Sequence, residues 1–459
     1  MKKYLLIVLT LIVNVVFSQK IEHIDPEQEK IRDLVFPHAV MAHRGTTYWA
    51  PEETESAYRW ARNIGADYLE VDIQRTSDGV MIALHDDDLK RTTDVEELFL
   101  RENSSNYSAG EYSYEDLMKL DAGSWFNKVN AGRARKSFSK SAEVIEVDSK
   151  AYTFGKLLAN GDIQGREKYE YTDDSGLSVD KVYIGGKQYI STLEDVLMIS
   201  KGWMIARNSK GERLYKKVKV NREIESGEAL VRYQFFYVKD PNDNGNRPGV
   251  YIETKEPKHY DNIETQLYES LTRYGWNVLL EPEDDNSFFI NSLVNTGNTN
   301  GKIVLQTFSP KSLEKLRQTF LGKIPCTFLL WKGDPNMPDD TDSSYIANIN
   351  FAVRNKANFI GPSIAGPPNN FDELLSKHQA RMIRKSGMKV HAYSFDTEEQ
   401  YHIYFSKAYR RRWRKTRTDA IFTNRAELTI NTFIDLGVYP FERNKVDALM
   451  VLEQLNYRK

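Results

Sequence analysis

Cysteine is almost absent from this sequence, which has a single one, Cys326, among 459 residues. One thiol excludes disulfides within the chain and zinc sites built from several thiolates. An excess of charge of one sign is also lacking, because 63 Lys and Arg residues stand against 65 Asp and Glu residues and leave a net charge of -2. No overall field therefore draws the chain to nucleic acid or to an anionic membrane, and specificity must come from a local site.

Long apolar runs are missing except at the amino terminus. There Lys2 and Lys3 precede the apolar segment Tyr4–Phe17, and Ser18 follows it. About 14 apolar residues fall short of the roughly 20 that cross a bilayer, so residues 1–18 are predicted to be a cleaved signal peptide. A single membrane anchor is the alternative. The prediction gives a secreted or periplasmic protein with no membrane span in the mature chain.

Short apolar runs alternate with helical patterns along the chain, which is typical of a repeating strand–helix unit. The predicted strands are Ala39–His43, Tyr68–Ile73, Val250–Lys255, Lys302–Phe308, Thr327–Trp331, Asn358–Gly361, Lys389–Phe395 and Asp419–Thr423. Eight parallel strands alternating with helices close into a (β/α)8 TIM barrel, an α/β fold whose active site lies at the carboxyl ends of the strands. A further run, Val80–Leu84, follows the short turn Thr76–Gly79 and is predicted to pair with the second strand as an antiparallel hairpin.

The chain is much longer than the about 250 residues of a minimal barrel. The surplus is predicted to form two polar insertions on the loop face between the second and third strands, at about 127–187 and 201–248, with a helix over Thr192–Ser200 between them. Such insertions are expected to wall the pocket rather than supply its chemistry. The predicted parts in chain order are the signal peptide 1–18, an N-terminal segment 19–37, the barrel 38–430 and a C-terminal helical extension 431–459.

Two carboxylates share one face of the second strand. Glu70 and Asp72 are two residues apart and so point the same way, and buried carboxylates repel each other unless they are protonated, paired or bound to a cation. Glu253 and Lys255 repeat this spacing on the third strand. Three carboxylates suit one hard divalent cation, with Ca²⁺ favoured and Mg²⁺ possible. An ordinary salt bridge at a strand end is the alternative for each pair.

Histidines stand at two further strand ends. His43 and Arg44 close the first strand before the turn at Gly45, and His85 ends the hairpin strand. Two imidazoles could take and give a proton near pH 7, while Arg44 and Lys255 could bind an anion. For either histidine seen alone, a solvated strand end is the alternative.

Together these motifs resemble the glycerophosphodiester phosphodiesterase family. They follow in the family's order and are His43-Arg44-Gly45, Pro51–Thr54, Leu69–Ile73, Leu84–Asp86, Arg91–Thr93, Ser191–Leu197, Ile252–Lys255, Gln306–Ser309, Val390–Asp396 and Asp419–Asn424. The resemblance spans about Val40 to Leu428. It implies a barrel enzyme that hydrolyses small-molecule glycerophosphodiesters to sn-glycerol 3-phosphate and an alcohol.

The resemblance also implies a role for each site residue. Glu70, Asp72 and Glu253 are the implied cation ligands. His43 and His85 are the implied proton-transfer groups. Arg44 and Lys255 are the implied phosphate-binding groups. Two positions depart from the family, because Glu53 replaces an asparagine and Tyr393 replaces the usual tryptophan, and both put substrate choice in doubt. Glu52 is a possible extra ligand or supporting group, and Trp125 is a possible wall of the pocket.

Two other functions stay open at this point. The same chemistry could release the headgroup of a lysophospholipid, or the barrel could bind a phosphate ligand without catalysis. A silent barrel would be expected to lack one of the five ligand and histidine residues, and all five are present. The basic run Tyr409–Arg417 is interpreted as a solvated helix end, so no nucleic-acid partner is predicted. The leaving alcohol and the oligomeric state stay open.

Overall fold

The computed structural model describes residues 20–99, 107–128, 183–223, 229–366, 371–405, 416–439 and 441–458, together with the backbone of four short strands between 143 and 164. These four are β4 (Glu143–Val147), β5 (Lys150–Phe154), β6 (Lys156–Leu157) and β7 (Ile163–Gln164). The predicted signal peptide, most of the first insertion and most of the basic run 409–417 lie outside the described residues.

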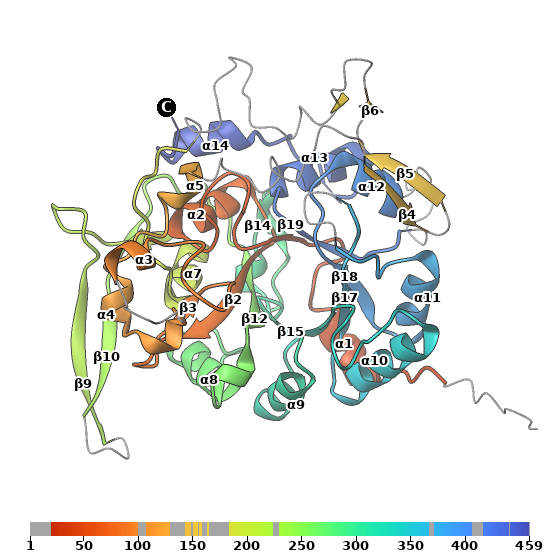
Figure 1. Ribbon diagram of the computed structural model, residues 1–459, viewed down its shortest axis with the longest axis horizontal. Coiled ribbons are helices and arrows are strands. Elements are labelled where there is room, and N and C mark those ends of the chain that lie inside the picture. Colours follow the sequence, from red (N-terminus) through yellow and green to blue (C-terminus); the bar gives the residue numbers. More distant parts are fainter. Residues whose placement is uncertain are drawn as a thin grey trace, which may run out of the picture.

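Eight parallel strands form a closed barrel at the centre of the molecule (Figure 1). In chain order they are β1 (Val40–Ala42), β2 (Tyr68–Arg75), β12 (Gly249–Thr254), β15 (Ile303–Thr307), β16 (Cys326–Leu330), β17 (Phe359–Pro362), β18 (Lys389–Ala392) and β19 (Ala420–Thr423). Each pairs with the next, and β1 pairs with both β19 and β2, which closes the ring. The predicted barrel and its strands are confirmed, with strand ends that differ by a few residues.

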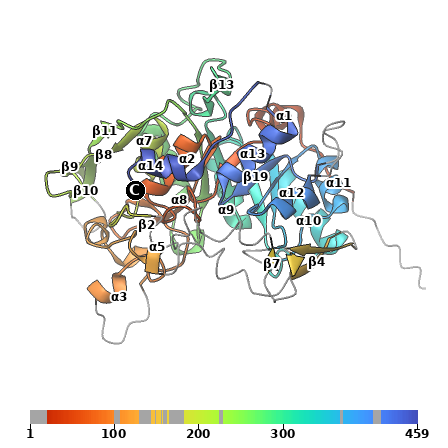
Figure 2. The ribbon, with the colours of Figure 1, turned by 90° about the horizontal axis from the view of Figure 1, so that it is seen from above.

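A helix follows each strand and covers the outside of the barrel (Figures 1 and 2). These helices are α2 (Glu55–Ile64), α7 (Leu193–Ser200), α8 (Ile263–Arg273), α9 (Pro310–Thr319), α10 (Asp342–Arg354), α11 (Lys377–Lys385), α12 (Glu398–Tyr404) and α13 (Ala426–Leu436). The outward side chains Leu69, Val71 and Ile73 of β2 are fully buried in the core between strands and helices. This alternation leaves the inward positions Glu70 and Asp72 free for the site.

The predicted hairpin and the helix after it are both confirmed. β3 (Met81–Ala83) pairs antiparallel with β2. Short helices follow, namely α3 (Val95–Leu98), η1 (Ala109–Glu111), α4 (Tyr114–Leu117) and α5 (Trp125–Lys128). Helix α7 begins with a capping box, in which the Asp195 N–H donates to the Thr192 hydroxyl and the Thr192 N–H donates to the Asp195 carboxylate.

The second insertion contains β8 (Trp203–Ile205), β9 (Tyr215–Glu223), β10 (Ala229–Phe235) and β11 (Tyr237–Lys239), paired as two antiparallel ribbons. The insertion begins after the last residue of α7 and ends where β12 begins. Both of its ends therefore lie at the face of the barrel formed by the amino-terminal ends of the strands. Arg213 binds Asp195 of α7, and Asp240 binds Arg62 of α2, which holds the insertion on the outside of these helices. None of its described residues lines the cavity at the carboxyl ends of the barrel strands. The expectation that it walls the pocket was wrong, because a segment that follows a barrel helix starts at the end opposite the active face.

The described segments before β1 and after β19 both pack against the barrel. Helix α1 (Pro26–Arg32) lies in the N-terminal segment, where Gln28 donates to the Gly322 carbonyl and accepts from Asn358. The boundary predicted at 430 falls inside α13, and α14 (Ala448–Gln454) then packs on α2, where the Trp60 indole donates to the Ala448 carbonyl at 3.1 Å.

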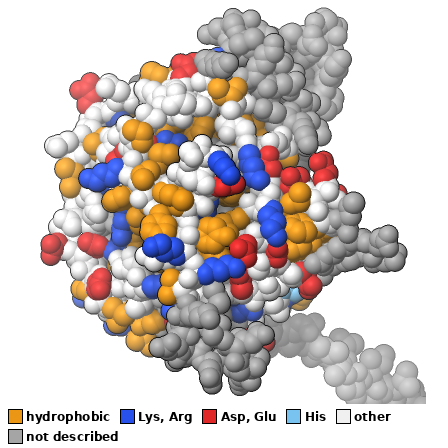
Figure 3. Space-filling view, turned by 90° about the vertical axis from the view of Figure 1, so that its left-hand side faces the viewer, with side chains coloured by type: hydrophobic (Ala, Val, Ile, Leu, Met, Phe, Trp, Pro, Cys, Tyr) orange, Lys and Arg blue, Asp and Glu red, His pale blue; other side chains and the backbone are white. Residues whose placement is uncertain are grey.

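The remaining short elements are η3 (Pro257–His259), β13 (Phe289–Ile290), β14 (Leu293–Val294) and η4 (Thr296–Asn298). Within the described part of the chain, no helix combines the length and the apolar character that crossing a bilayer requires. Basic and acidic side chains are interspersed on the side of the molecule that carries β9 and β10 (Figure 3), in keeping with the net charge near zero.

Candidate active site

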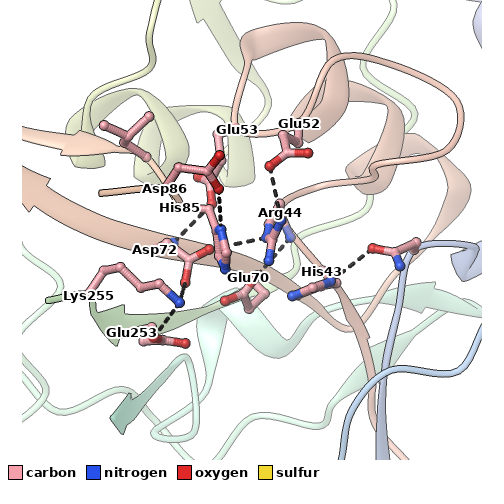
Figure 4. A network of polar contacts seen from close by, with 12 residues as sticks. His43, Arg44, Glu52, Glu53, Glu70, Asp72, His85, Asp86, Glu253 and Lys255 are labelled. Carbon is pink, nitrogen blue, oxygen red and sulfur yellow. Dashed lines mark hydrogen bonds and ion pairs between the residues drawn. The ribbon is translucent and has the colours of Figure 1, made fainter. Parts of the chain in front are cut away.

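The carboxyl ends of the barrel strands open into a cavity of about 830 Å³. Every residue predicted to bind a cation, transfer a proton or bind phosphate lines this cavity. These residues are His43, Arg44, Glu70, Asp72, His85, Glu253 and Lys255. Figure 4 shows them at close quarters, coming from β1, β2, β12 and the loop after β3.

Carboxylates crowd one side of the cavity floor. One oxygen each of Glu53, Glu70 and Asp72 lies within 4.8 Å of the other two. Glu253 stands directly opposite Asp72 in the register of β12 and β2, so their side chains are neighbours on the same face. The cluster therefore contains the three predicted ligands and adds Glu53 next to two of them.

The protein alone does not balance this negative charge. Burial raises the pKa of Glu70, and the charges of Asp72 and Glu253 raise it further. Burial likewise raises the pKa of Glu253 to about 8. At Asp72 burial disfavours the charged form, but Lys255, His85 and Arg44 outweigh it, and the pKa falls below its usual range.

Two buried oxygens beside this cluster accept no hydrogen bond from the described residues. They are Oδ2 of Asp72, which faces Arg44 Nε at 3.3 Å, and Oε1 of Gln306, whose Nε2 donates to Glu70 at 2.9 Å. A set of oxygen donors with surplus negative charge fits a hard divalent cation. The residues present thus suit the predicted divalent cation.

The cationic side chains lie beside the carboxylates. Lys255 Nζ is 3.2 Å from Glu253 and 4.0 Å from Asp72, and Arg44 Nη1 is 3.0 Å from Glu52. Both oxygens of Glu52 also accept from Arg91, at 2.6 and 3.0 Å. Glu52 therefore stands between two guanidinium groups behind the cavity, away from the carboxylate cluster.

Each histidine is held through Nδ1. The Nδ1 atom of His85 lies 2.7 Å from Asp86, whose carboxylate also binds Arg91. The Nδ1 atom of His43 lies 2.9 Å from the Asn424 side-chain oxygen, and the Asn424 amide donates to Asp396 at 3.0 Å. The other nitrogen, Nε2, is then the one placed for proton transfer in both rings.

Both imidazoles favour the neutral form. Burial, assisted by the charge of Arg44, lowers the pKa of His43 to about 3. Burial, with Arg44 and Lys255, lowers the pKa of His85 to about 4. A phosphate anion between these groups would offset the repulsion from the two cations.

Glu53, Asn424, Asp396 and Asp86 have supporting positions that the motifs alone did not assign. The Glu53 carboxylate accepts from the Asp72 N–H at 3.1 Å and from the Tyr58 hydroxyl at 2.5 Å. Asn424 and Asp396 belong to motifs that were recognised, but no spacing in the sequence indicates that they meet His43.

The two aromatic candidates lie in different places. Tyr393 lines the cavity, and its hydroxyl donates to the Leu330 carbonyl at 2.6 Å. Trp125 does not contribute to the described lining, and its ring lies 5.8 Å from the Arg91 guanidinium.

Comparison with known proteins gives concordant matches. The model of the glycerophosphoryl diester phosphodiesterase family matches residues 43–267 and 251–428. A glycerophosphodiester phosphodiesterase of Bacillus subtilis is 24% identical over 372 residues, which cover 81% of this chain and 81% of the relative. Another, from Caldanaerobacter subterraneus, is 35% identical over 106 residues, or 23% of this chain and 40% of the relative.

A solved structure supports the fold. A crystal structure from Silicibacter pomeroyi, assigned to the same family, covers 90% of this chain and 98% of its own, with a TM-score of 0.50 and 14% identity. Because the family match runs through nearly the whole barrel and every residue brought together at its active face, the chain belongs to the glycerophosphoryl diester phosphodiesterase family and is a phosphoric diester hydrolase.

Proposed function

We propose that this enzyme hydrolyses glycerophosphodiesters to sn-glycerol 3-phosphate and an alcohol, and that it requires one divalent cation. The supporting observation is what lines the one cavity: two oriented imidazoles, two fixed cationic side chains and three buried carboxylates. Glu70, Asp72 and Glu253 would hold the cation, with Ca²⁺ favoured and Mg²⁺ possible. Once bound, the cation would neutralise charge on the non-bridging phosphate oxygens.

Arg44 and Lys255 bind the phosphate in this proposal. Both are buried beside carboxylates, which keeps them charged and limits their motion. Fixed cations cost little reorganisation when negative charge develops on the phosphate.

His43 and His85 share the proton transfers. One removes the proton from the attacking oxygen, and the other donates a proton to the leaving alcohol oxygen. Asn424 and Asp86 hold the two Nδ1 atoms and thereby aim Nε2 of each ring. The attacking oxygen is either water or the neighbouring hydroxyl of the substrate, which would form a cyclic phosphate first.

A second candidate substrate class is the lysophospholipids. The side chains of Leu329, Phe308 and Phe371 give the cavity an apolar wall against which an acyl chain could pack. A panel of soluble glycerophosphodiesters and lysophospholipids, assayed for alcohol and glycerol 3-phosphate release, distinguishes the two candidates. Binding without product release from any of them would favour the silent barrel.

Removal of the cation tests the metal assignment. Chelation should abolish turnover, and Ca²⁺ or Mg²⁺ should restore it. In titration calorimetry, Glu70→Gln should weaken cation binding because the substitution removes a charged ligand. The control Glu314→Gln changes an exposed carboxylate on α9 and should bind the cation as the wild type does. Full turnover of a metal-free preparation would contradict the assignment.

We also propose that the enzyme acts outside the cytoplasm. The support is the basic start and short apolar run of residues 1–18. Amino-terminal sequencing of the exported protein should find a mature chain that begins near Gln19. Retention of Met1 on a membrane-bound product would favour the anchor instead.

A further inference from the structure

Aromatic rings make up most of the apolar wall of the cavity. Trp331, Phe371, Tyr393 and Phe308 all line it. The ring centroids of Trp331 and Phe371 are 5.3 Å apart, and those of Phe371 and Tyr393 and of Tyr393 and Phe308 are each 5.8 Å apart. The interplanar angles of these three pairs are 73°, 64° and 87°, so the rings stand across one another instead of stacking.

The rings are in position before a substrate arrives. Tyr393 is held by its hydrogen bond to the Leu330 carbonyl. Trp331 directly follows β16 and remains 40% exposed, which is unusual for so large an apolar side chain. This wall therefore offers aromatic surface to a ligand group at the side of the phosphate site.

A carboxylate without a countercharge lies in the same wall. Asp334 ends the turn that begins at Trp331, and it lines the cavity with Glu256. Glu256 has Lys258 Nζ at 2.7 Å, whereas no described cationic side chain lies within 4 Å of the Asp334 carboxylate. Burial and the nearby charge of Glu256 raise the pKa of Asp334. A cation supplied by the substrate would relieve this repulsion.

We propose that Trp331, Phe371, Tyr393 and Asp334 bind the trimethylammonium group of a choline leaving alcohol, which makes glycerophosphocholine the preferred substrate. The inference rests on the proposed function and specifies its leaving group. Aromatic faces attract quaternary ammonium ions through the ring quadrupole, and a nearby carboxylate adds to that attraction. A neutral acyl chain would gain nothing from Asp334, and a polyol would need several hydrogen-bonding groups on this wall.

Hydrolysis of glycerophosphocholine forms one bond at phosphorus and breaks another. When water attacks, its oxygen forms the new bond to phosphorus, and the bond from phosphorus to the choline oxygen breaks. One proton leaves the water for one histidine, and the other histidine gives a proton to the choline oxygen. The products are glycerol 3-phosphate and choline.

The test compares matched diesters of glycerol 3-phosphate. Their alcohols are choline, ethanolamine, glycerol, and 3,3-dimethylbutanol, which has the shape of choline without its charge. The choline diester should have a kcat/KM about tenfold above that of the neutral isostere. Trp331→Leu and Asp334→Asn should remove most of this difference while changing kcat/KM for the glycerol diester less than about twofold.

The control Asp340→Asn alters an exposed carboxylate close by in the same loop and should keep the choline preference. Equal rates for choline and its neutral isostere would overturn the proposal and favour an apolar group. An equal loss on every diester in Trp331→Leu would also overturn it.

Direct binding separates this proposal from the reaction. Tetramethylammonium should bind the wild type with an affinity about tenfold above that of Trp331→Leu, measured by calorimetry. If no diester is hydrolysed but this difference appears, the proposed function fails and the cation site stands. If diesters are hydrolysed and tetramethylammonium binds both proteins equally, the cation site fails.

Discussion

Each histidine in the cavity is oriented by a side chain at its Nδ1 atom, and His43 meets its partner only in the folded chain. Asn424 accepts from Nδ1 of His43 and is itself held by Asp396, through its side-chain amide at 3.0 Å and its backbone N–H at 2.9 Å. Asp86 binds Nδ1 of His85 at 2.7 Å. The tautomer and the direction of each ring are therefore set outside the ring itself.

Loss of either histidine should slow the reaction. His43→Ala and His85→Ala should each lower kcat about 100- to 10,000-fold, because a positioned proton-transfer group is removed. Steady-state kinetics together with circular dichroism would separate this effect from unfolding. A folded variant with near-normal kcat would remove that residue from the mechanism.

Asn424 should act through His43. Asn424→Ala should lower kcat about tenfold or more with little change in KM, since the ring loses its orientation. Asn424→Asp places a carboxylate at Nδ1, which favours the imidazolium and should move the acid limb of the pH–rate profile to higher pH.

Nitrogen NMR of the imidazoles would report the tautomer of His43 directly. The control Asn286→Ala changes an exposed amide and should alter neither kcat nor the tautomer. An unchanged His43 tautomer in a slow Asn424→Ala variant would assign Asn424 a merely structural role.

At the scale of elements, the ion pair of Arg213 with Asp195 is one of the buried ion pairs that join the second insertion to the barrel helices. Arg213 binds both oxygens of Asp195, at 2.5 and 2.7 Å, and its guanidinium lies 3.7 Å from the centre of the Phe235 ring. Asp195 is also the residue that completes the capping box of α7. The same carboxylate therefore caps the start of α7 and anchors the insertion to that helix.

Breaking this pair should destabilise the protein without changing its chemistry. Arg213→Met leaves Asp195 buried without its countercharge, and it should lower the free energy of unfolding by about 3–5 kcal/mol in urea titrations. Replacing both partners, in Arg213→Met with Asp195→Asn, should restore part of that loss.

A control variant and a kinetic measurement accompany Arg213→Met. Lys217→Ala, in the same insertion, breaks an exposed ion pair with Glu115 of α4 and should have a much smaller effect. The kcat of folded Arg213→Met should remain close to that of the wild type, because the described part of the insertion does not line the cavity. A selective change of substrate preference would contradict the corrected position of the insertion.

At the scale of the whole molecule, the fold keeps a histidine neutral far from the cavity. His38 precedes β1 and is 8% exposed, and burial lowers its pKa to about 4. In the unfolded chain the same side chain takes a proton near pH 6.5. Between these two values the unfolded state binds the extra proton, so stability must fall as the pH falls.

Acid should therefore weaken the protein partly through His38. On going from pH 7 to pH 4 this residue should contribute a loss of up to about 3 kcal/mol in the free energy of unfolding. His38→Asn should lose less stability over that range, since asparagine tolerates the positive φ of 67° and does not titrate. Denaturant curves at pH 8 give the reference, because His38 is neutral there in both states. Identical acid slopes would contradict the prediction.

The order of strands and helices, the hairpin at β3 and the residues at the strand ends follow from the sequence alone. The physical reason is that alternation along a strand and periodicity along a helix are local, and a barrel places the carboxyl ends of its strands on one face. Glu70 and Asp72 on one strand, and Glu253 and Lys255 on another, could therefore be assigned to one site from their positions along the chain.

Contacts between distant segments were decided only by the tertiary structure. Asn424 lies 381 residues from His43, and no local period relates them. The missing countercharge of Asp334 and the place of the second insertion likewise depend on what surrounds each segment after folding. Sequence patterns report which face a side chain occupies, whereas its partners depend on how separate elements pack.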